Sequence, residues 1–461
     1  MTPQDLGCSR EMDEVRVGSL TFKVTSEAID RDGAIVSRGT TVWKVNHVDE
    51  AVESTPLVLK EAWRYDERGV EGELLSHATD QNIRGVARYC AHENDDESVH
   101  KLLGEGILKG AKPWAMRSKK RRHESIQGPS KRSRTFSQNT SSIPSRNTSN
   151  RASSNTSYRT SSKTSYRASR NTSNKTPTSG AADPNAKPSG PVPSPLVPGS
   201  GPKPAPITPP KKIPNRIRTL TVLERGIPLT EWRKHGELAL LRCFRDAIRG
   251  HFSLLKDAKI LHRDISINNI MIACQSEIDY HYGFLIDLDL AIRLSGDNVA
   301  ACGAPERTGT YEFLSINALL RTDDKKFHHC YYDDLESFFW VLLYVCHGDP
   351  RRSETIQSWS QPEKTPAFSK LVLATSSEMF SFLLDEMDER CKGGLWESLF
   401  TSFRRSLFTF PSLRENNVDP VSPRVREEVM KEEVMKKIYS EIIEGFEQAI
   451  GEIQNIQENT A

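Results

Sequence analysis

Apolar and polar residues alternate in short runs near the N-terminus, and turn residues separate the runs. Residues 21–29, 40–48 and 56–63 are rich in β-branched and aromatic side chains, which is typical of strands. Residues 66–78 place apolar side chains at three- and four-residue steps, which predicts a helix. A further short run at residues 86–89 predicts another strand. The predicted order is therefore strands, one helix and strands.

Longer helical patterns dominate the second half of the chain. Residues 218–226 predict a strand that runs into a turn, and residues 229–255 predict one long helix or two shorter ones. Residues 282–291 predict a strand followed by a loop, and residues 331–347 predict an apolar helix. This half is therefore expected to be mainly helical.

A last helix is predicted from residue 424 onward. Its apolar side chains form one stripe, which consists of Val429, Val434, Met435, Ile438, Ile442, Phe446 and Ala449. We expect this stripe to pack on the rest of the helical half, and contact with a partner protein is the alternative.

The composition changes sharply between the two halves. Residues 117–215 consist mainly of Ser, Thr, Asn, Arg and Pro, with too few apolar residues to offset the entropy lost on ordering. Residues 117–216 hold 20 Lys or Arg and two acids, which leaves 43 bases and 59 acids elsewhere. We expect a disordered basic insert in an acidic protein. Its charge suits nucleic acid, an acidic partner or the protein's own acidic surface.

The compartment is predicted from what the sequence does not contain. The N-terminal residues hold no apolar run, no apolar stretch reaches the roughly 18 residues that cross a bilayer, and the eight cysteines form no Cys-x-x-Cys pair. We therefore expect an intracellular protein with reduced thiols and no membrane contact. Basic clusters at residues 119–122 and 131–134 resemble a bipartite nuclear localisation signal, which favours the nucleus over the cytoplasm. A solvated basic linker is the alternative.

Polar residues interrupt an apolar segment at residues 260–272, and their spacing suggests chemistry. His262-Arg263-Asp264 is followed, five residues after the aspartate, by Asn269. An Asp and an Asn at this spacing form the phosphoryl-transfer loop of protein kinases, in which the Asp accepts the substrate hydroxyl proton and the Asn holds Mg²⁺. The alternative is an ordinary polar loop between two buried strands.

Phosphoryl transfer also needs a cation at the nucleotide phosphates. Lys60 lies in an otherwise apolar strand segment, from which it could reach α- and β-phosphates. Glu71 is its expected acidic partner, with Glu73 in reserve. Only Gly39 and Val42 resemble a glycine-rich phosphate loop. A surface ion pair is the alternative for Lys60.

A second metal ligand is expected after the segment from His262 to Asn269, which is called the catalytic loop below. Asp287 ends a strand segment, as the aspartate of Asp-Phe-Gly does in kinases. Leu288 stands in place of Phe and can serve the same packing role, and Asp289 stands in place of Gly. Asp289 either joins metal binding or restricts the loop, and the sequence does not decide between these roles.

Two further segments are expected to support the catalytic loop. Gly309-Thr310 begins a segment like the one that shapes the peptide-substrate site, with the Thr310 hydroxyl bonded to Asp264. Asp334, near the start of the apolar helix at residues 331–347, is expected to accept backbone hydrogen bonds from the loop. A role as helix-capping carboxylate is the alternative, and both roles are compatible.

Together these motifs resemble the fungal-type protein kinase family, within the eukaryotic protein-kinase superfamily. The resemblance is carried by H-R-D-I-S-x-x-N at 262–269, I-D-L-D-L-A at 286–291, G-T-x-x-F-L-S at 309–315 and D-D-L-E-S-F-F at 333–339. It implies an α+β, bilobal protein-kinase-like fold with a long disordered insert between the small-lobe strands and the hinge. The implied domains are most of the small lobe at 1–116, the insert at 117–215, the hinge strand and large lobe at 216–410, and a C-terminal linker and helix at 411–461.

The resemblance also implies ATP and Mg²⁺ as cofactors. It assigns nucleotide binding to Lys60, Glu71, Gly39, Val42 and Asp287, catalysis to Asp264 with Lys60, Asn269 and Arg263, and Mg²⁺ to Asn269 and Asp287. Ser266 departs from the usual pattern, because Ser/Thr kinases usually have a lysine there that touches the γ-phosphate. The glycine loop is incomplete, and Ala304-Pro305-Glu306 comes before the segment that it usually follows.

The predicted function is ATP-dependent transfer of the γ-phosphate to Ser/Thr hydroxyls of protein substrates. A pseudokinase that keeps the fold and acts by partner contacts is the main alternative. A small-molecule phosphotransferase is disfavoured, because residues 309–317 and 333–340 predict a peptide platform. Nucleic-acid binding by the insert is a further hypothesis. The sequence does not specify the substrate or the oligomeric state.

Overall fold

The computed structural model describes residues 14–26, 28–31, 39–48, 55–98, 215–274, 281–294, 309–320, 328–409 and 427–460. The chain divides into two compact units, Met1–Pro113 with Lys212–Ala461, and Trp114–Lys211. All described residues belong to the first unit. Apart from Asn215, the predicted insert with its basic clusters lies outside the described residues, as does Ala304-Pro305-Glu306.

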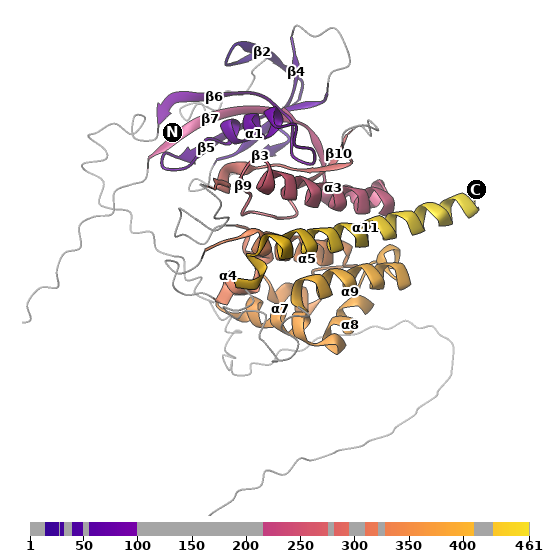
Figure 1. Ribbon diagram of the computed structural model, residues 1–461. Coiled ribbons are helices and arrows are strands. Elements are labelled where there is room, and N and C mark those ends of the chain that lie inside the picture. Colours follow the sequence, from indigo (N-terminus) through magenta and orange to yellow (C-terminus); the bar gives the residue numbers. More distant parts are fainter. Residues whose placement is uncertain are drawn as a thin grey trace, which may run out of the picture. The chain divides into compact units, whose positions relative to one another are not determined.

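An antiparallel sheet of seven strands is built mainly from the N-terminal residues (Figure 1). Its strands are β1 (Glu14–Val17), β2 (Leu20–Val24), β3 (Asp30–Arg31), β4 (Thr41–His47), β5 (Leu57–Tyr65), β6 (Tyr89–Ser98) and β7 (Arg216–Glu224). The order is β1-β2-β4-β5-β7-β6, and β3 pairs with β4. β7 thus inserts between two strands from the first hundred residues and joins the two halves of the chain in one sheet.

The register of β5 decides where Lys60 points. Successive side chains of a strand lie on opposite faces of the sheet. Val58 packs in one apolar cluster with Leu75 of α1 (Glu71–Asp80), whereas Leu59 belongs to a different cluster. Lys60 shares the face of Val58 and therefore points toward α1.

Two small sheets follow β7 and carry the loops of the candidate site. One has the order β11-β10-β8 and consists of β8 (Gly226–Pro228), β10 (Ile270–Ala273) and β11 (Gly283–Leu285); the other pairs β9 (Ile260–Leu261) with β12 (Ile292–Arg293). β10 and β11 are antiparallel neighbours. The loop before β10 and the loop after β11 therefore emerge at the same end of this sheet.

Most of the remaining described residues are helical. The α-helices are α3 (Glu237–Lys256), α4 (Ile316–Leu320), α5 (Tyr331–Cys346), α6 (Glu354–Ser358), α7 (Thr365–Thr375), α8 (Ser377–Asp385), α9 (Gly394–Phe408) and α11 (Glu432–Thr460). Short 3-10 helices are η2 (Leu229–Lys234), η3 (Leu288–Leu290), η4 (Tyr311–Phe313) and η6 (Glu389–Cys391). Nearly every residue of α5 is buried, as expected for a helix that is apolar on most sides, so α5 lies at the centre of the main core.

The C-terminal helix α11 packs along α3 and α9 (Figure 1). Its buried positions include the predicted stripe residues Met435, Ile438, Ile442, Phe446 and Ala449. Val434 is partly buried against the same core. The expected packing of this stripe on the helical half is confirmed.

Most predicted elements are present, although several ends differ. The combination of helices with an antiparallel sheet confirms the α+β class. α1 begins only at Glu71, because residues 66–68 form a turn that the apolar pattern did not separate from the helix. The strand predicted at residues 86–89 begins only at Tyr89, and Val86 forms a single isolated bridge.

Within the part of the chain that the structure describes, no helix by itself has the length and apolar composition of a membrane span. α7 and α8 have this length and composition only when they are taken together, and the two helices are bent by 102° relative to each other.

Candidate active site

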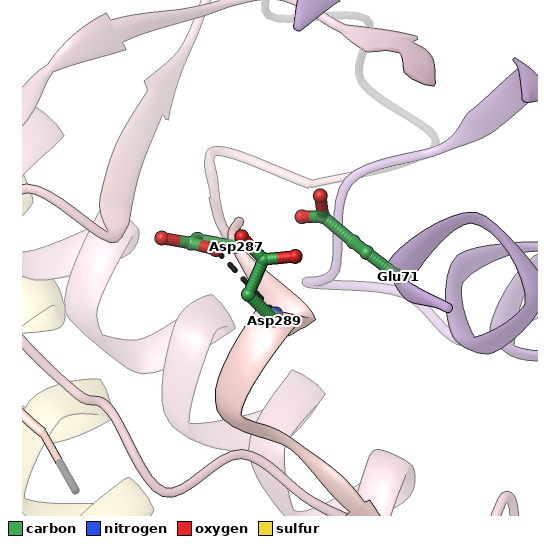
Figure 2. Close-up of side chains that lie close together, drawn as sticks. All are labelled: Glu71, Asp287 and Asp289. Carbon is green, nitrogen blue, oxygen red and sulfur yellow. Dashed lines mark hydrogen bonds between the residues drawn. The ribbon is translucent and has the colours of Figure 1, made fainter. Parts of the chain in front are cut away.

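Lys60 lies among three carboxylates at the junction of β5, α1 and the loop after β11. Its Nζ donates to Glu71 Oε2 at 2.7 Å, to Asp287 Oδ1 at 2.9 Å and to Asp289 Oδ2 at 3.3 Å. Figure 2 shows Glu71 reaching from α1 toward the two aspartates. The predicted pair of Lys60 and Glu71 is formed, whereas the reserve candidate Glu73 is exposed.

Three carboxylates surround a single ammonium group here, so negatively charged groups outnumber positive ones in this cluster. Burial alone would lower the pKa of Lys60, but the charges of Asp287, Asp289 and Glu71 hold it above its usual range. Burial raises the pKa of Glu71 to about 7 against the opposing charge of Lys60. The cluster therefore attracts a further cation, either a proton or a metal ion.

The loop after β11 has a backbone conformation that a non-glycine residue rarely adopts. Asp287 lies in the left-handed region, with φ of 65° and ψ of 73°. Leu288 N donates to Glu71 Oε1 at 3.1 Å, and Asp289 N donates to Asp287 Oδ1 at 3.4 Å. The Leu288 side chain is buried in the apolar cluster that includes α1 residues, which is the packing role predicted for it. Hydrogen bonding and packing thus join this loop to α1.

Asp264 is held in the loop between β9 and β10. Its Oδ1 accepts hydrogen bonds from Thr310 Oγ1 at 2.9 Å and from Thr310 N at 2.8 Å, so the predicted hydroxyl bond is present. Burial and the charge of Asp287 raise the pKa of Asp264, while His262 and the Thr310 bonds oppose that rise. A carboxylate with a raised pKa is a better proton acceptor than an ordinary one.

Asn269 connects the two loops of the site. Its Nδ2 donates to Asp264 O at 2.8 Å, which leaves Oδ1 as the atom that could bind a metal. Ile286 N donates to Asn269 O at 3.0 Å, directly before Asp287 in the chain. The two predicted Mg²⁺ ligands, Asn269 and Asp287, therefore lie on two loops that a backbone hydrogen bond joins directly beside them.

His262 lies inside the loop, and both of its ring nitrogens bond to backbone groups. Nδ1 accepts from Asp264 N at 3.3 Å, so Nε2 is the donor to Ile286 O at 3.0 Å. Burial lowers the pKa of His262, which agrees with this neutral form. His262 thus ties the backbone of the catalytic loop to the backbone before Asp287.

Asp334 of α5 holds the other side of the catalytic loop. Its Oδ2 accepts from Arg263 N at 3.0 Å, as predicted, and Arg263 adopts a left-handed φ of 69°. Two histidines that the sequence did not indicate also donate to this carboxylate, His251 at 2.8 Å and His329 at 2.6 Å. Burial alone would raise the pKa of Asp334, but the charge of His329 and the hydrogen bonds of both histidines hold it well below its usual range.

The alternative role of Asp334 as helix-capping carboxylate is wrong. α5 begins at Tyr331 with Cys330 as N-cap residue, and the carboxylate of Asp333 accepts from Cys330 N at 2.9 Å. The third helical position is the one from which a side chain can reach back to the N-cap amide. Asp334 is one residue too late and points to the catalytic loop instead.

The segment after Thr310 is anchored by two buried ionisable side chains that the sequence did not predict. Lys370 of α7 is fully buried and donates to the carbonyl oxygens of Glu312 and Leu314, each at 2.7 Å. Glu336 of α5 accepts from Ile316 N at 2.7 Å. No local pattern marks Lys370, because its partners are backbone carbonyls 58 and 56 residues away.

Ser266 occupies a buried position in the catalytic loop. Its side chain is 1% exposed, and its hydroxyl forms no hydrogen bond with any described residue. A buried hydroxyl without a partner costs free energy, so its presence is easier to explain if a ligand supplies the partner.

The two residues expected at the phosphate loop lie beside β5. Gly39 has a φ of 57° and precedes β4. Val42 of β4 lies opposite Lys60 in the ladder between β4 and β5, and it packs against the same apolar cluster as α1. The residues between β3 and Gly39 lie outside the described part of the chain.

The donor atoms of the site suit a hard divalent cation. Glu71, Asp287 and Asp289 bring ligand oxygens within 4.8 Å of one another (Figure 2). Mg²⁺ prefers oxygen ligands and is usually held by one or two carboxylates together with substrate phosphates. The residues present therefore fit Mg²⁺.

Comparison with known protein families agrees with this site. A family model described as fungal protein kinase matches residues 5–346. The chain therefore belongs to the fungal protein kinase family. No curated protein sequence matches the chain.

Proposed function

We propose that the protein is an ATP-dependent kinase that transfers the γ-phosphate to Ser or Thr hydroxyls of protein substrates. In this proposal the sheet with α1 is the nucleotide-binding small lobe and the helical part is the large lobe. The observation that carries it is the connected set of Lys60, Glu71, Asp287 and Asp264. These residues come from four separate segments, yet the ion pairs and loop hydrogen bonds join their side chains or backbones in one place.

Each residue has a distinct role in the proposed reaction. Lys60, oriented by Glu71, neutralises α- and β-phosphate oxygens. Asp287 and Asn269 would hold Mg²⁺, which supplies charge neutralisation at the phosphates when it is bound. Asp264 accepts the proton of the substrate hydroxyl while the new O–P bond forms and the bond to the ADP leaving group breaks.

The anchored segment after Thr310 favours a protein substrate over a small molecule. Its backbone is held by Lys370 and Glu336 from two different helices. Thr310 at its start also contacts Asp264. A rigid backbone segment next to the base can align an extended peptide, whereas a small molecule needs no such surface.

The second candidate function is a pseudokinase that signals through partner contacts. Ser266 favours it, since no lysine charge is present at this position in the catalytic loop. The incomplete glycine loop around Gly39 favours it as well. The buried ion pairs of Lys60 weigh against it, because isolated binding modules have no need for a costly buried charge cluster.

Phosphate transfer by the wild type and by Asp264→Asn tests the proposed function. Radiolabelled ATP with Mg²⁺ would be offered with a peptide panel and with the protein's own Ser/Thr-rich residues 117–215. We expect incorporation by the wild type and a loss of at least about 100-fold in Asp264→Asn, the usual scale of general-base contributions. Equal background incorporation by both proteins, with ATP binding intact, would establish the pseudokinase instead.

A further inference from the structure

The C-terminal helix contributes a buried hydroxyl to a hydrogen-bond chain that ends at the catalytic loop. Tyr439 of α11 bonds through its hydroxyl to His251 Nδ1 of α3 at 2.6 Å. His251 Nε2 bonds to Asp334 Oδ2 at 2.8 Å, and the same oxygen accepts from Arg263 N at 3.0 Å. α11 lies beyond residues 5–346, to which the family model extends.

The side chains that form this hydrogen-bond chain are shielded from water. Tyr439 and His251 are each 1% exposed, and Asp334 is fully buried. The Tyr439 ring also stacks on Tyr331 of α5, with ring centroids 5.7 Å apart. A buried network of this kind has no water to replace a lost partner, so each member depends on the next.

Asp334 is ionised and accepts only, so His251 donates to it from Nε2. In the neutral tautomer with its proton on Nε2, His251 accepts at Nδ1 from the Tyr439 hydroxyl. Burial raises the pKa of Tyr439 well above its usual range, which keeps this phenol protonated.

We propose that Tyr439 is a positioning residue for phosphate transfer, which acts through His251 and Asp334 on the backbone of Arg263. The proposal rests on the proposed kinase function. Arg263 is held in a left-handed conformation, which reverts to ordinary backbone angles unless it is restrained. Arg263 directly precedes Asp264, so the angle of its backbone sets where the base carboxylate lies. The active site is therefore incomplete without the C-terminal helix.

The decisive variant is Tyr439→Phe in the full chain, with Tyr331→Phe as matched control. Tyr331 also buries a hydroxyl that bonds to the α11 side of the core, at Val429 O, but it has no bond to His251 or Asp334. Both variants lose one buried hydroxyl and keep the aromatic ring. We expect both to lose similar thermal stability. Only Tyr439→Phe should lower kcat, by about tenfold as for other residues that orient a catalytic group, with KM for ATP unchanged.

A second measurement does not depend on activity. Hydrogen exchange of the Arg263 amide should accelerate at least about tenfold in Tyr439→Phe and stay at the wild-type rate in Tyr331→Phe. In a His251→Leu background, Tyr439→Phe should have no additional effect on either readout, because the path is already broken.

Equal kcat and equal Arg263 exchange in the two single variants would overturn the proposal. A wild type without phosphate transfer would refute the kinase function alone, since the exchange comparison would still decide whether Tyr439 positions the loop.

Discussion

Lys60 shows how burial and charge compete at a single residue. A lone buried ammonium group is unfavourable, yet three carboxylates within hydrogen-bond distance keep it charged. One positive charge does not satisfy three negative ones, and burial raises the pKa of Glu71 to about 7. The site can therefore exchange a proton for a metal ion near neutral pH.

The competition between proton and Mg²⁺ predicts a pH-dependent stabilisation. The pKa of Glu71 is raised from 4.5 to about 7, so the folded state binds an extra proton between these values. This contribution to stability is complete below pH 4.5 and is lost as the pH rises through about 7. We expect MgCl2 to raise the Tm more at pH 8 than at pH 6, because at pH 8 no proton competes. Thermal unfolding at both pH values measures this.

Glu71→Gln is the control for the pH effect, because its amide does not titrate. The Mg²⁺-induced change in Tm should then be nearly the same at pH 6 and pH 8. A wild-type Tm shift that is independent of pH would contradict the assignment.

Ser266→Ala separates a ligand contact from a structural one. The hydroxyl has no partner among the described residues, so its removal should leave the free energy of unfolding unchanged or raise it slightly. If Ser266 bonds to the γ-phosphate, kcat should fall about tenfold to 100-fold, the value of one hydrogen bond to a charged group. Urea unfolding and phosphate transfer would be compared in the same preparation.

Ser315→Ala is the matched control for Ser266→Ala. The Ser315 hydroxyl is buried too, but it donates to Asp333 Oδ1 at 2.7 Å and accepts from Ala318 N at 3.1 Å. We expect this variant to lose about 1–3 kcal/mol of stability. A similar loss in Ser266→Ala would mean that its hydroxyl has a structural partner.

At the scale of elements, close backbone contacts decide how the pieces meet. α3 touches the loop before β6 at Gly250 and Gly85, where no side chain fits between the backbones. His281 Nδ1 accepts from Gly85 N in the same region, at 3.3 Å, and bonds through Nε2 to Glu224 of β7 at 3.0 Å. These contacts attach the sheet to the helix that precedes the catalytic loop.

Gly250→Ala is predicted to be strongly destabilising. A Cβ at this position would overlap with the carbonyl group of Gly85, and backbone atoms cannot move aside as a flexible side chain can. We expect a loss of about 2–4 kcal/mol, because overpacking and backbone displacement add. Gly451→Ala in α11 is the control. A Cβ at this position meets no atom within 4 Å. The substitution should therefore stabilise the protein by about 0.5–1 kcal/mol, the amount by which glycine is less favourable than alanine in a helix interior. Equal effects of both substitutions on urea unfolding would refute the contact.

At the scale of the whole molecule, the long segment between β6 and β7 is topologically a hairpin connection. Ser98 near its start pairs with Ile217 near its end. A much shorter connection could therefore join the same two strands. The described pairings of β7 with β5 and β6 all involve residues outside 117–215.

Replacement of residues 102–212 by a Gly/Ser linker of about eight residues should preserve folding. Each halving of a loop lowers its closure cost by about 0.6 kcal/mol, so the shortened chain should be more stable by on the order of 1–2 kcal/mol. Phosphate transfer to an added peptide should continue at the wild-type rate. Loss of cooperative thermal unfolding would show that the segment is part of the folded core.

The same variant tests nucleic-acid binding by the basic insert. We propose that any such binding depends on the 19 bases of residues 117–215, all of which the replacement removes, so the affinity of the full chain should fall steeply with salt and vanish in the shortened chain. Binding that survives the replacement would place the contact on the folded unit.

The local sequence was sufficient for features that depend on neighbouring residues. Strand and helix patterns, the Asp264–Asn269 spacing and the composition of the insert are all local, and so they indicate the α+β class and the chemistry of the loops. The start of a helix is not visible where a turn continues the apolar pattern of the helix, as at residues 66–78, of which only Glu71 and the residues after it are helical.

Tertiary structure alone decided which distant residues meet. The positions of His251, His329 and Tyr439 around Asp334, and of Lys370 on two backbone carbonyls, leave no periodic pattern in the chain. Burial explains this, because a buried polar group is satisfied by whichever partner the fold brings within reach, at any separation in sequence. The spacing of residues along the chain indicated candidates for the chemistry, and packing decided which side chains hold them in place.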